Sequence, residues 1–476
     1  MAEKAKKERP AKEMTMKIAL FGFFAPLVVL IALILLGADV AIASLIALFI
    51  MAIFCLVMGT KWEDIEAAMA EGVHQVAGAT IVMLLVGCMV AIWMASGTIP
   101  TMLYYGMKIV TPELYLPVCF ILPAFMSICT GTSWGSISTI GVVLCGMAAG
   151  LGIPVGMAAG AVISGAFVGD KCSPLSDCTL LGASACEVPL FTHVKSMFYT
   201  MIPSFIICLV LYTLLGLNAS GSIDTAAVNE LSNGIASTFH ISIIHVIPII
   251  VVLVLSAKQV PAFITFGIGI ALGIIWAMIF QGRGFMESLG FVMSGFNADS
   301  GVAAVDTLVN RGGFSSMLSL VGMIIVIGML SGLFNKSGVL NVLVGGLTKR
   351  LRSPKSIILG AGVSSILMAM AGGQYPSIAI PAVAFKDICD EMDINRAVLA
   401  RMLADTGVVV SSIIFWNAWT MGYGVVLGGF STLDTIPYNF LAFVCPIVAV
   451  IFNFLGIGFF HKDEEVKYHL LWKKTK

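Results

Sequence analysis

GDKCSPLSDCT, residues 169–179, places three ionisable side chains, Asp170, Lys171 and Asp177, in a chain that is otherwise strongly apolar. The run directly before it, GMAAGAVISGAFV, is long enough to lie within a membrane. An ionised side chain inside hydrocarbon costs several kcal/mol, so residues of this kind are candidates for a functional site. If the motif were a loop at the membrane surface, its three charged side chains would be solvated and would need no functional explanation. The apolar flanks and the adjacent proline favour a position inside the membrane instead.

Pro174 predicts a break in this membrane helix. Proline lacks the backbone N–H, and its ring clashes with the carbonyl group four residues earlier, which here belongs to Asp170. We expect the incoming helix to end near 169–171 and a second helix to begin with Ser173 as N-cap and Pro174 as first helical residue. The break frees carbonyl oxygens on one side and exposes a positive helix N-terminus on the other. Lys171 either neutralises Asp170 when no ion is bound or extends to the interface as an anchor.

The composition indicates a polytopic helical membrane protein. Of the 476 residues, 59% are hydrophobic and 11% charged, against about 25% charged in soluble proteins. Many windows offer the roughly 20 apolar residues that cross a bilayer, and we expect about 11–13 spans. The formal net charge is zero, so no overall positive field attracts nucleic acid. The eleven cysteines form no CxxC motif, so neither a disulfide framework nor a zinc site is expected.

The second half of the chain repeats the first at an offset of 241 residues. This register pairs Gly87 with Gly328, and it pairs further identities up to Thr179 with Thr420. The basic loop TKRLRSPK (348–355) predicts a cytoplasmic position, whereas its counterpart in the first half falls outside when the helices are followed from a cytoplasmic N-terminus. The two halves therefore face opposite ways, as in many secondary transporters. The expected fold is all-α, with two inverted-topology repeats that contain broken or re-entrant helices.

The same reasoning divides the chain into eight segments. They are a basic cytoplasmic N-terminus (1–16), an N-terminal helical hairpin (17–60), transmembrane repeat 1 (61–217), an extracytoplasmic loop (218–239), linking transmembrane helices (240–281), the inverted repeat 2 (282–436), a last span (437–460) and a C-terminal tail (461–476).

Further polar clusters interrupt the apolar spans in both halves. They lie in CTGTSWGS (129–136), AGGQYPS (371–377) and ADTGVVVSSIIFWNAWT (404–420). Backbone that leaves the helix at membrane depth is tolerated only inside protein or beside a wet cavity, although glycine and serine also serve close helix packing. Arg401 lies one turn before Asp405, which predicts a local ion pair. The candidate site residues in these clusters are Thr132, Ser133, Gln374, Tyr375, Asp405, Ser411, Ser412 and Asn417.

Three stretches, GTSWGS, SGAFVGDKCSPLSDCT and LADTGVVVSSIIFWNAW, resemble the NhaC family of Na⁺/H⁺ antiporters within the ion-transporter superfamily. The resemblance covers most of the chain. It implies an electrochemically driven exchanger in a bacterial inner membrane, with re-entrant hairpins that move as an elevator against a scaffold, and by analogy a homodimer. Cys178 departs from the family pattern, which usually has threonine after the second aspartate. Similar proteins include malate/lactate exchangers, so the resemblance identifies the coupling ions better than the solute.

We therefore expect an antiporter, not an enzyme, in which Na⁺ and H⁺ compete for carboxylates near the membrane midplane. Asp170 and Asp177 would be the main carriers, holding Na⁺ between them, with Asp405 third. Ser173, Ser176 and either Thr132 or Ser133 would complete the oxygen shell. No cofactor beyond the transported ions is expected.

Two alternatives remain open from the sequence. An exchanger of small organic anions on the same fold would hold a substrate carboxylate with Gln374 and the helix N-terminus at Ser173. A sizeable pocket beside the cation site would favour it. An intramembrane aspartyl protease would need a glycine where Phe167 stands and a second aspartate on a neighbouring helix, which only Asp405 supplies.

Overall fold

The computed structural model describes residues 13–109, 111–219, 225–258, 260–310, 312–348, 351–428 and 431–466. All regular secondary structure within these ranges is helical. Nine of the described helices are long and apolar enough to cross a membrane, or eleven if each of two bent pairs is one span. The protein is thus a polytopic all-α membrane protein. A count of nine spans falls short of the expected 11–13, and a count of eleven meets its lower bound. The expected N-terminal segment up to residue 12, residues 220–224 of the 218–239 loop and the tail from 467 lie outside the described residues.

The first repeat contains one long helix, a short helix, a helical hairpin, a broken helix and a last long helix. Its elements are α3 (Trp62–Ala95), α4 (Thr98–Ile109), α5 (Pro112–Thr130), α6 (Ser133–Ser136), the π-helix η1 (Ile137–Gly141), α7 (Val142–Gly150), α8 (Val155–Cys172), α9 (Asp177–Ala185) and α10 (Leu190–Ala219).

The second repeat follows the first at the same offset, and its helices extend past the expected bounds of 282–436. It comprises α15 (Ala303–Val309), α16 (Phe314–Lys336), α17 (Val339–Thr348), α18 (Pro354–Gly372), α19 (Gln374–Glu391), α20 (Arg396–Leu403), the π-helix η4 (Ala404–Val408), η5 (Ser411–Ile413), α21 (Ala418–Leu427), α22 (Thr432–Thr435), η6 (Ile436–Tyr438) and α23 (Phe440–Leu455). The starts of α17, α19, α20 and α21 each lie 241 residues after those of α4, α6, α8 and α9. The duplication seen in the sequence therefore holds for these helices, whereas the two π-helices differ in position: η1 lies in the hairpin of the first repeat and η4 in the broken helix of the second.

The remaining helices precede or link the repeats. They are α1 (Met16–Leu35), α2 (Val40–Val57), α11 (Thr225–Thr238), η3 (Ile243–Val246), α12 (Ile247–Ala257), α13 (Ala262–Phe280) and α14 (Phe285–Ser294).

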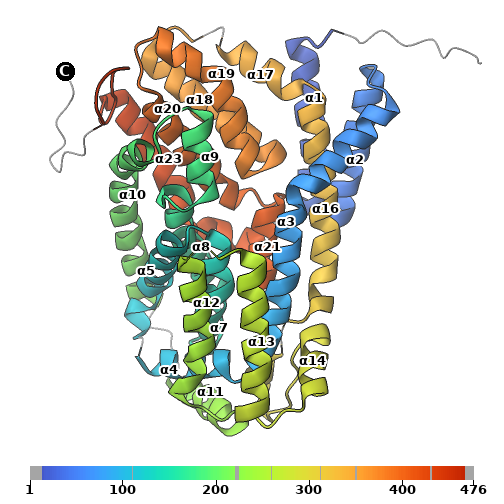
Figure 1. Cartoon of the computed structure of the whole chain (residues 1–476), viewed down its shortest axis with the longest axis vertical. Helices are drawn as coiled ribbons and strands as arrows, with labels where there is room; N and C mark the ends of the chain where they lie inside the picture. Colours follow the sequence, from blue (N-terminus) through green and yellow to red (C-terminus); the bar gives the residue numbers. More distant parts are fainter. Residues whose placement is uncertain are drawn as a thin grey trace, which may run out of the picture.

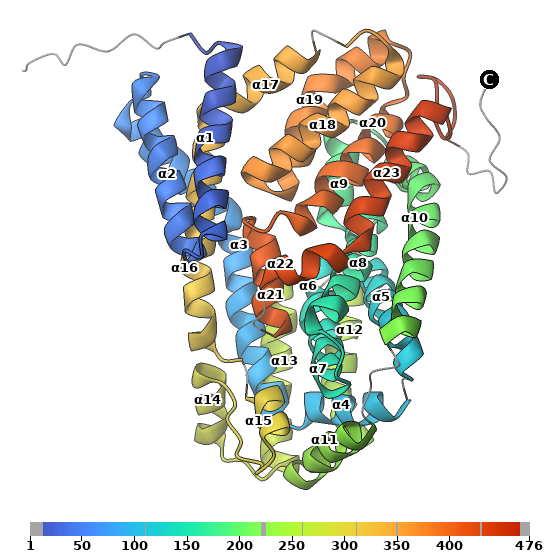
Figure 2. The same cartoon turned by 180° about the vertical axis from the view of Figure 1, so that it is seen from behind.

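The two repeats are inverted with respect to each other. Helix α4 lies beside α11 at one end of the molecule, whereas its counterpart α17 lies at the opposite end, near the start of α1 (Figures 1 and 2). The hairpin α18–α19 occupies the end of the molecule where α17 lies, and α7 of the other hairpin extends to the end where α4 lies (Figure 2). The two hairpins thus enter from opposite ends.

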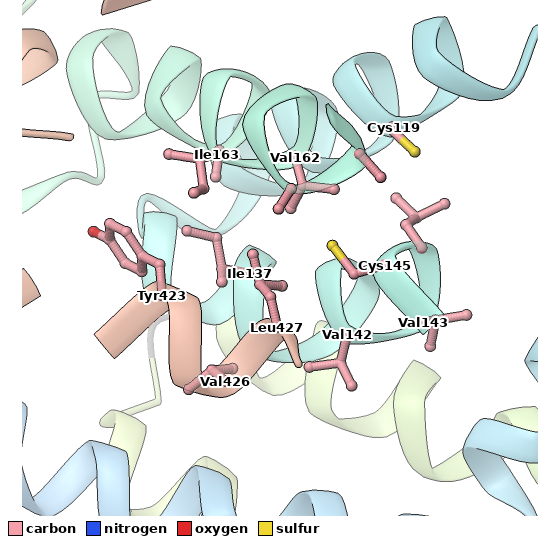
Figure 3. Packing of buried hydrophobic residues seen from close by; sticks show 14 of the residues in the cluster. Cys119, Ile137, Val142, Val143, Cys145, Val162, Ile163, Tyr423, Val426 and Leu427 are labelled. Atoms are coloured by element: carbon pink, nitrogen blue, oxygen red, sulfur yellow. The ribbon is translucent and has the colours of Figure 1, made fainter. Parts of the chain in front are cut away.

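Packing between the repeats is close because small residues line the contacts. On α3, Gly72 faces Gly328 of α16, where an added Cβ would stand 2.0 Å from the Gly328 carbonyl oxygen. Helix α21 of the second repeat packs on η1, α7 and α8 of the first, and Figure 3 shows Leu427 between Val162 and the η1–α7 segment. Small residues at such contacts let helices in a membrane approach closely enough for van der Waals attraction to hold them together.

A cluster of ion pairs outside the spans joins the loop between α9 and α10 to the second repeat. Glu187 accepts hydrogen bonds from Lys386 of α19 and from Arg396, the first residue of α20. These two bonds hold the pKa of the Glu187 carboxyl below its usual value. Because Glu187 is exposed, the pairs add little to stability.

Gly169 is required where α8 crosses the first hairpin. Its N–H donates to Ser127 Oγ at 2.9 Å, and an added Cβ would lie 2.0 Å from the Ser127 carbonyl carbon. We expect Gly169→Ala to force the two helices apart and to destabilise the folded protein by at least about 1–3 kcal/mol, measured as thermal unfolding in detergent. Gly267→Ala on α13, where an added Cβ meets no atom within 4 Å, is the control and should unfold at the wild-type temperature or slightly above it. Equal behaviour of the two variants would contradict the close crossing.

Candidate functional site

Three interruptions in the helices meet around Asp170. The first is the hairpin tip between α5 and α6, the second is the tip between α18 and α19, and the third is the break between α8 and α9. Gly131 ends α5 in the left-handed region (φ 73°), and Gly373 separates α18 from α19 (φ 83°). Glycine adopts such angles without strain, so the chain can turn sharply at both tips.

Two of these interruptions donate a side-chain hydrogen bond to the Asp170 carboxylate, and the third brings a serine hydroxyl next to it. Ser133 Oγ donates to Oδ2 at 2.9 Å, Gln374 Nε2 donates to Oδ2 at 3.2 Å, and Ser176 Oγ lies 3.1 Å from Oδ1. Asp170 is 7% exposed, and the structure gives it no ion pair with any described residue. A buried carboxylate with hydroxyl and amide neighbours and no fixed cation suits a mobile cation or a proton.

The break after Asp170 lies a few residues later than the sequence indicates. Helix α8 runs to Cys172, and α9 begins at Asp177 with Ser176, not Ser173, as its N-cap; Ser176 Oγ accepts from Cys178 N at 3.2 Å. The expected cap at Ser173 is wrong because the chain makes a turn at Pro174 and Leu175 and enters a helix only at Asp177. The Ser173 hydroxyl donates to the Ile128 carbonyl oxygen of the hairpin at 2.7 Å. Ser173 also accepts from Leu175 N, which makes a local turn around Pro174.

The carbonyl oxygens freed by this break are partly taken up by hydroxyl groups. Ser176 Oγ donates to the Asp170 carbonyl oxygen at 2.6 Å, and Thr179 Oγ1 donates to that of Lys171 at 2.9 Å. Asp177 stands at the first position of α9, where the helix dipole favours a negative charge.

A cavity of about 450 Å³ opens beside the Asp170 carboxylate. Of the expected site residues, the cavity takes in Thr132, Ser133, Asp170, Asp177, Gln374 and Tyr375. Its complete lining is Gln75, Gly78, Val82, Thr130, Gly131, Thr132, Ser133, Trp134, Gly135, Asp170, Leu175, Asp177, Cys178, Ser256, Val260, Ala262, Thr265, Phe266, Gln374 and Tyr375. The sequence did not indicate the residues from α3, α12 and α13, because these lie in ordinary apolar spans and carry no motif.

Lys171 does not face Asp170. It forms an ion pair with Asp405 of η4, and both side chains are fully buried. Thr200 Oγ1 donates to Asp405 Oδ1 at 2.9 Å and also accepts from Lys171 Nζ at 3.3 Å. Both expectations for Lys171 are therefore wrong, because its ammonium group neither pairs with Asp170 nor reaches the interface.

Arg401 is likewise not the partner of Asp405. Its guanidinium donates to the carbonyl oxygens of Gly458 and Ser196 and to Ser196 Oγ, and it lies near the ring of Tyr199. The predicted local ion pair is wrong because Arg401 turns toward α10 and the segment after α23. Asp405 is also absent from the cavity lining, so the structure does not bring it to Asp170.

The other second-repeat candidates lie away from the cavity. Ser411 donates to the Val408 carbonyl oxygen at 2.6 Å and Ser412 to that of Val409 at 2.7 Å. Ser412 Oγ also accepts from Asn439 Nδ2 at 2.8 Å. Asn417 lines a separate small cavity with Gly373 and Trp416. Among the described residues, no group of three or more His, Cys, Asp or Glu side chains converges as a metal cluster would.

The family model of the Na⁺/H⁺ antiporter family matches residues 10–188 and 165–457 of this chain. The chain belongs to this family. The two matched stretches together include both repeats, and each contains the Asp170 region.

Individual relatives within the family carry different names. The chain is 34% identical over 92% of its length to a malate-2H⁺/Na⁺-lactate antiporter of Bacillus subtilis, covering 94% of that protein. It is 32% identical over 90% of its length to the Na⁺/H⁺ antiporter NhaC of Alkalihalophilus pseudofirmus, covering 93% of it. It is also 32% identical over 86% of its length to the arginine/ornithine antiporter ArcD of Halobacterium salinarum, covering 84% of it. All three relatives are named as antiporters, and their solutes differ.

Proposed function

We propose that this chain is a secondary antiporter that exchanges Na⁺ for H⁺, with the two ions competing for the carboxylate of Asp170. The observation that carries the proposal is the position of Asp170. It is buried where two hairpin tips and a helix break meet, it is surrounded by hydroxyl and amide groups, and it lacks an ion pair among the described residues. Broken helices that present carbonyl oxygens near the midplane are the usual setting for Na⁺ and H⁺ in such transporters.

Competition between the ions is sufficient to couple their fluxes. When Asp170 is protonated, Na⁺ has no carboxylate to bind, and when Na⁺ is bound, the proton is excluded. Only a neutralised site crosses the membrane at low cost, because a bare carboxylate in hydrocarbon is unfavourable. Asp177, at the cavity side of α9, would add a second carboxylate for Na⁺, with Ser133, Ser176 and Thr132 supplying oxygens. We do not include Asp405, whose Oδ1 pairs with Lys171 and which lies outside the cavity lining, or Ser173, whose hydroxyl donates to the Ile128 carbonyl oxygen.

We also place the protein in a bacterial inner membrane with a cytoplasmic N-terminus. The basic segment MAEKAKKERPAKEMTMK and the basic loop 348–355 support this orientation. A homodimer is proposed by superfamily analogy. The protease alternative loses its second aspartate, because Asp405 is tied to Lys171 and lies outside the cavity.

The test is transport by the purified full-length protein in liposomes. An imposed Na⁺ gradient should drive a counter-directed proton flux, reported by a pH-sensitive dye inside the vesicles. Because the ions compete, the apparent KM for Na⁺ should rise as the pH falls, whereas the maximal rate at saturating Na⁺ should stay constant. A maximal rate that falls with pH at an unchanged KM would contradict a shared site.

A second candidate function is exchange of a small organic solute, and the cavity itself favours it. A volume of about 450 Å³ exceeds the space that one cation requires. The same liposomes, given malate, lactate or amino acids on either side, separate an exchanger that only moves ions from one that carries a solute.

A further inference from the structure

The cavity beside Asp170 has the dimensions of a small-molecule site. It measures about 450 Å³, whereas a water molecule takes about 30 Å³ of liquid volume and small-molecule sites range over about 300–1,000 Å³. A dehydrated Na⁺ bound at Asp170 would leave most of this volume for something else.

The cavity has two walls formed by different parts of the fold. One wall consists of the hairpin tips and the break between α8 and α9, which carry the two aspartates. The other wall comes from α3, α12 and α13 and includes Gln75, Gly78 and Thr265. An added Cβ at Gly78 would meet no atom within 4 Å, so the space in front of this wall is open.

The charges that line the cavity are all negative. Two acidic residues, Asp170 and Asp177, line the cavity. No Lys, Arg or His occurs among the described residues that line it. Lys171, the basic residue next to Asp170 in the sequence, turns away to Asp405. Three helices, α6, α9 and α19, begin at this cavity, each with about half a positive elementary charge at its N-terminus. The negative charge of two ionised carboxylates is larger than the summed positive charge of these three helix N-termini. An organic anion in this cavity would therefore be repelled and would find no basic side chain to pair with.

Aromatic rings complete the lining. Tyr375 is 37% exposed beside the tip of the second hairpin. Trp134 lies on the first hairpin and contacts Tyr423, with ring centroids 4.6 Å apart and ring planes tilted by 44°. Phe266 belongs to the opposite wall. Aromatic faces attract organic cations through the ring quadrupole, whereas a carboxylate gains nothing from them. The combination of two aspartates with aromatic rings therefore matches an ammonium group on a small organic body.

We propose that this cavity binds a small organic ammonium ion, of the size of a diamine or an amino acid, that competes with Na⁺ for Asp170 and Asp177. The proposal rests on the proposed function, because it takes Asp170 as the cation site. It departs from the organic-anion alternative, which the charges of the lining do not support.

The experiment measures exchange of ²²Na⁺ for Na⁺ by the full-length protein in liposomes at equal pH on both sides, so that an amine cannot act by collapsing a pH gradient. Putrescine and lysine are the ammonium probes, and malate and lactate are the anion probes. We expect putrescine or lysine to inhibit ²²Na⁺ uptake competitively and the two anions to have no effect. Tyr375→Leu should raise the inhibitory concentration of the ammonium probe by about 2- to 30-fold. Gly78→Leu, which fills the open space, should raise it as well.

The matched control is Gly267→Leu on α13, which also points into open space but lies outside the cavity lining and should leave the inhibition unchanged. Inhibition by malate or lactate alone would overturn the inference and leave Na⁺/H⁺ exchange standing. Active ²²Na⁺ exchange without inhibition by any probe would also overturn it, because the cavity would then hold only water. If the protein carries no ²²Na⁺, the proposed function fails. The inference is then decided by thermal stabilisation of the purified protein, which putrescine or lysine should produce and whose absence would overturn it.

Discussion

Replacing Asp170 by asparagine is expected to abolish Na⁺-driven proton movement while leaving the protein folded. Asparagine keeps the shape of the side chain and can still hydrogen-bond Ser133 and Gln374, which now surround the carboxylate at 2.9 and 3.2 Å. The asparagine side chain has no carboxylate, so it can neither take up a proton at the pH of the assay nor neutralise the charge of Na⁺. Removing one charge of a buried ionic contact costs about 3–5 kcal/mol, which corresponds to about a 100- to 4,000-fold loss of Na⁺ affinity.

The measurement is the rate of internal pH change in liposomes at several Na⁺ concentrations, together with the elution profile and unfolding temperature of the purified variant. Asp170→Glu is the matched variant, because it keeps the charge and moves it by one methylene. We expect it to retain exchange with a raised KM for Na⁺. Wild-type exchange by a well-folded Asp170→Asn protein would remove Asp170 from the mechanism.

Asp177 serves as an internal comparison for the same assay. Its side chain is exposed at the cavity, and no hydrogen bond to it from another described residue matches those that hold Asp170. Asp177→Asn is therefore expected to weaken Na⁺ binding less than Asp170→Asn does. The difference in Na⁺ affinity between the two variants shows how much the burial of Asp170 contributes to Na⁺ binding.

The sequence was sufficient for the elements whose causes are local or periodic. Pro174 and the flanking apolar runs indicated a broken helix next to Asp170, and the 241-residue register indicated the duplication that the helix starts confirm. The prediction of where the second half-helix begins was wrong. The second half-helix begins only after a turn at Pro174 and Leu175, and this turn is joined to another helix through the hydrogen bond from Ser173 to the Ile128 carbonyl oxygen. Neighbouring residues in the sequence do not indicate such a contact.

Charge partners were predicted poorly for the same reason. The spacing of Arg401 and Asp405 suggested a pair within one helix, but the π-helix η4 changes the local turn there, and the packing of α8 supplies Lys171 from a distant part of the chain. The far wall of the cavity comes from α12 and α13, which lie outside both repeats. Long-range packing decides these features, whereas propensity and periodicity report only on short segments.

The second large effect is expected at the buried pair of Lys171 and Asp405. Both side chains are fully buried, and the pair links the broken helix of the first repeat to η4 of the second. Lys171→Met leaves the Asp405 carboxylate without its cation, and Asp405→Asn leaves the Lys171 ammonium without its anion. Each single change should therefore destabilise the protein by about 3–5 kcal/mol.

The double variant Lys171→Met with Asp405→Asn separates the loss of a contact from the cost of an orphaned charge. It removes both charges together, and replacing a buried pair by neutral groups is often neutral in stability. We expect it to unfold near the wild-type temperature in detergent. The control is Lys336→Met, which breaks the Lys–Asp pair with Asp64 at 3.1 Å, where both side chains are about half exposed. Such surface pairs contribute about 0–1 kcal/mol, so this control should change little.

Transport by the double variant then tells which role the pair has. Recovery of both stability and Na⁺/H⁺ exchange would mean that Lys171 and Asp405 only join α8 to η4. Recovered stability without exchange would mean that transport requires the charges of Lys171 and Asp405 when Asp170 binds and releases its ion. If the double variant were as unstable as either single variant, the orphaned-charge argument would be wrong. The hydrogen bonds from Thr200 and the packing around Asp405 would then carry the stability of this contact.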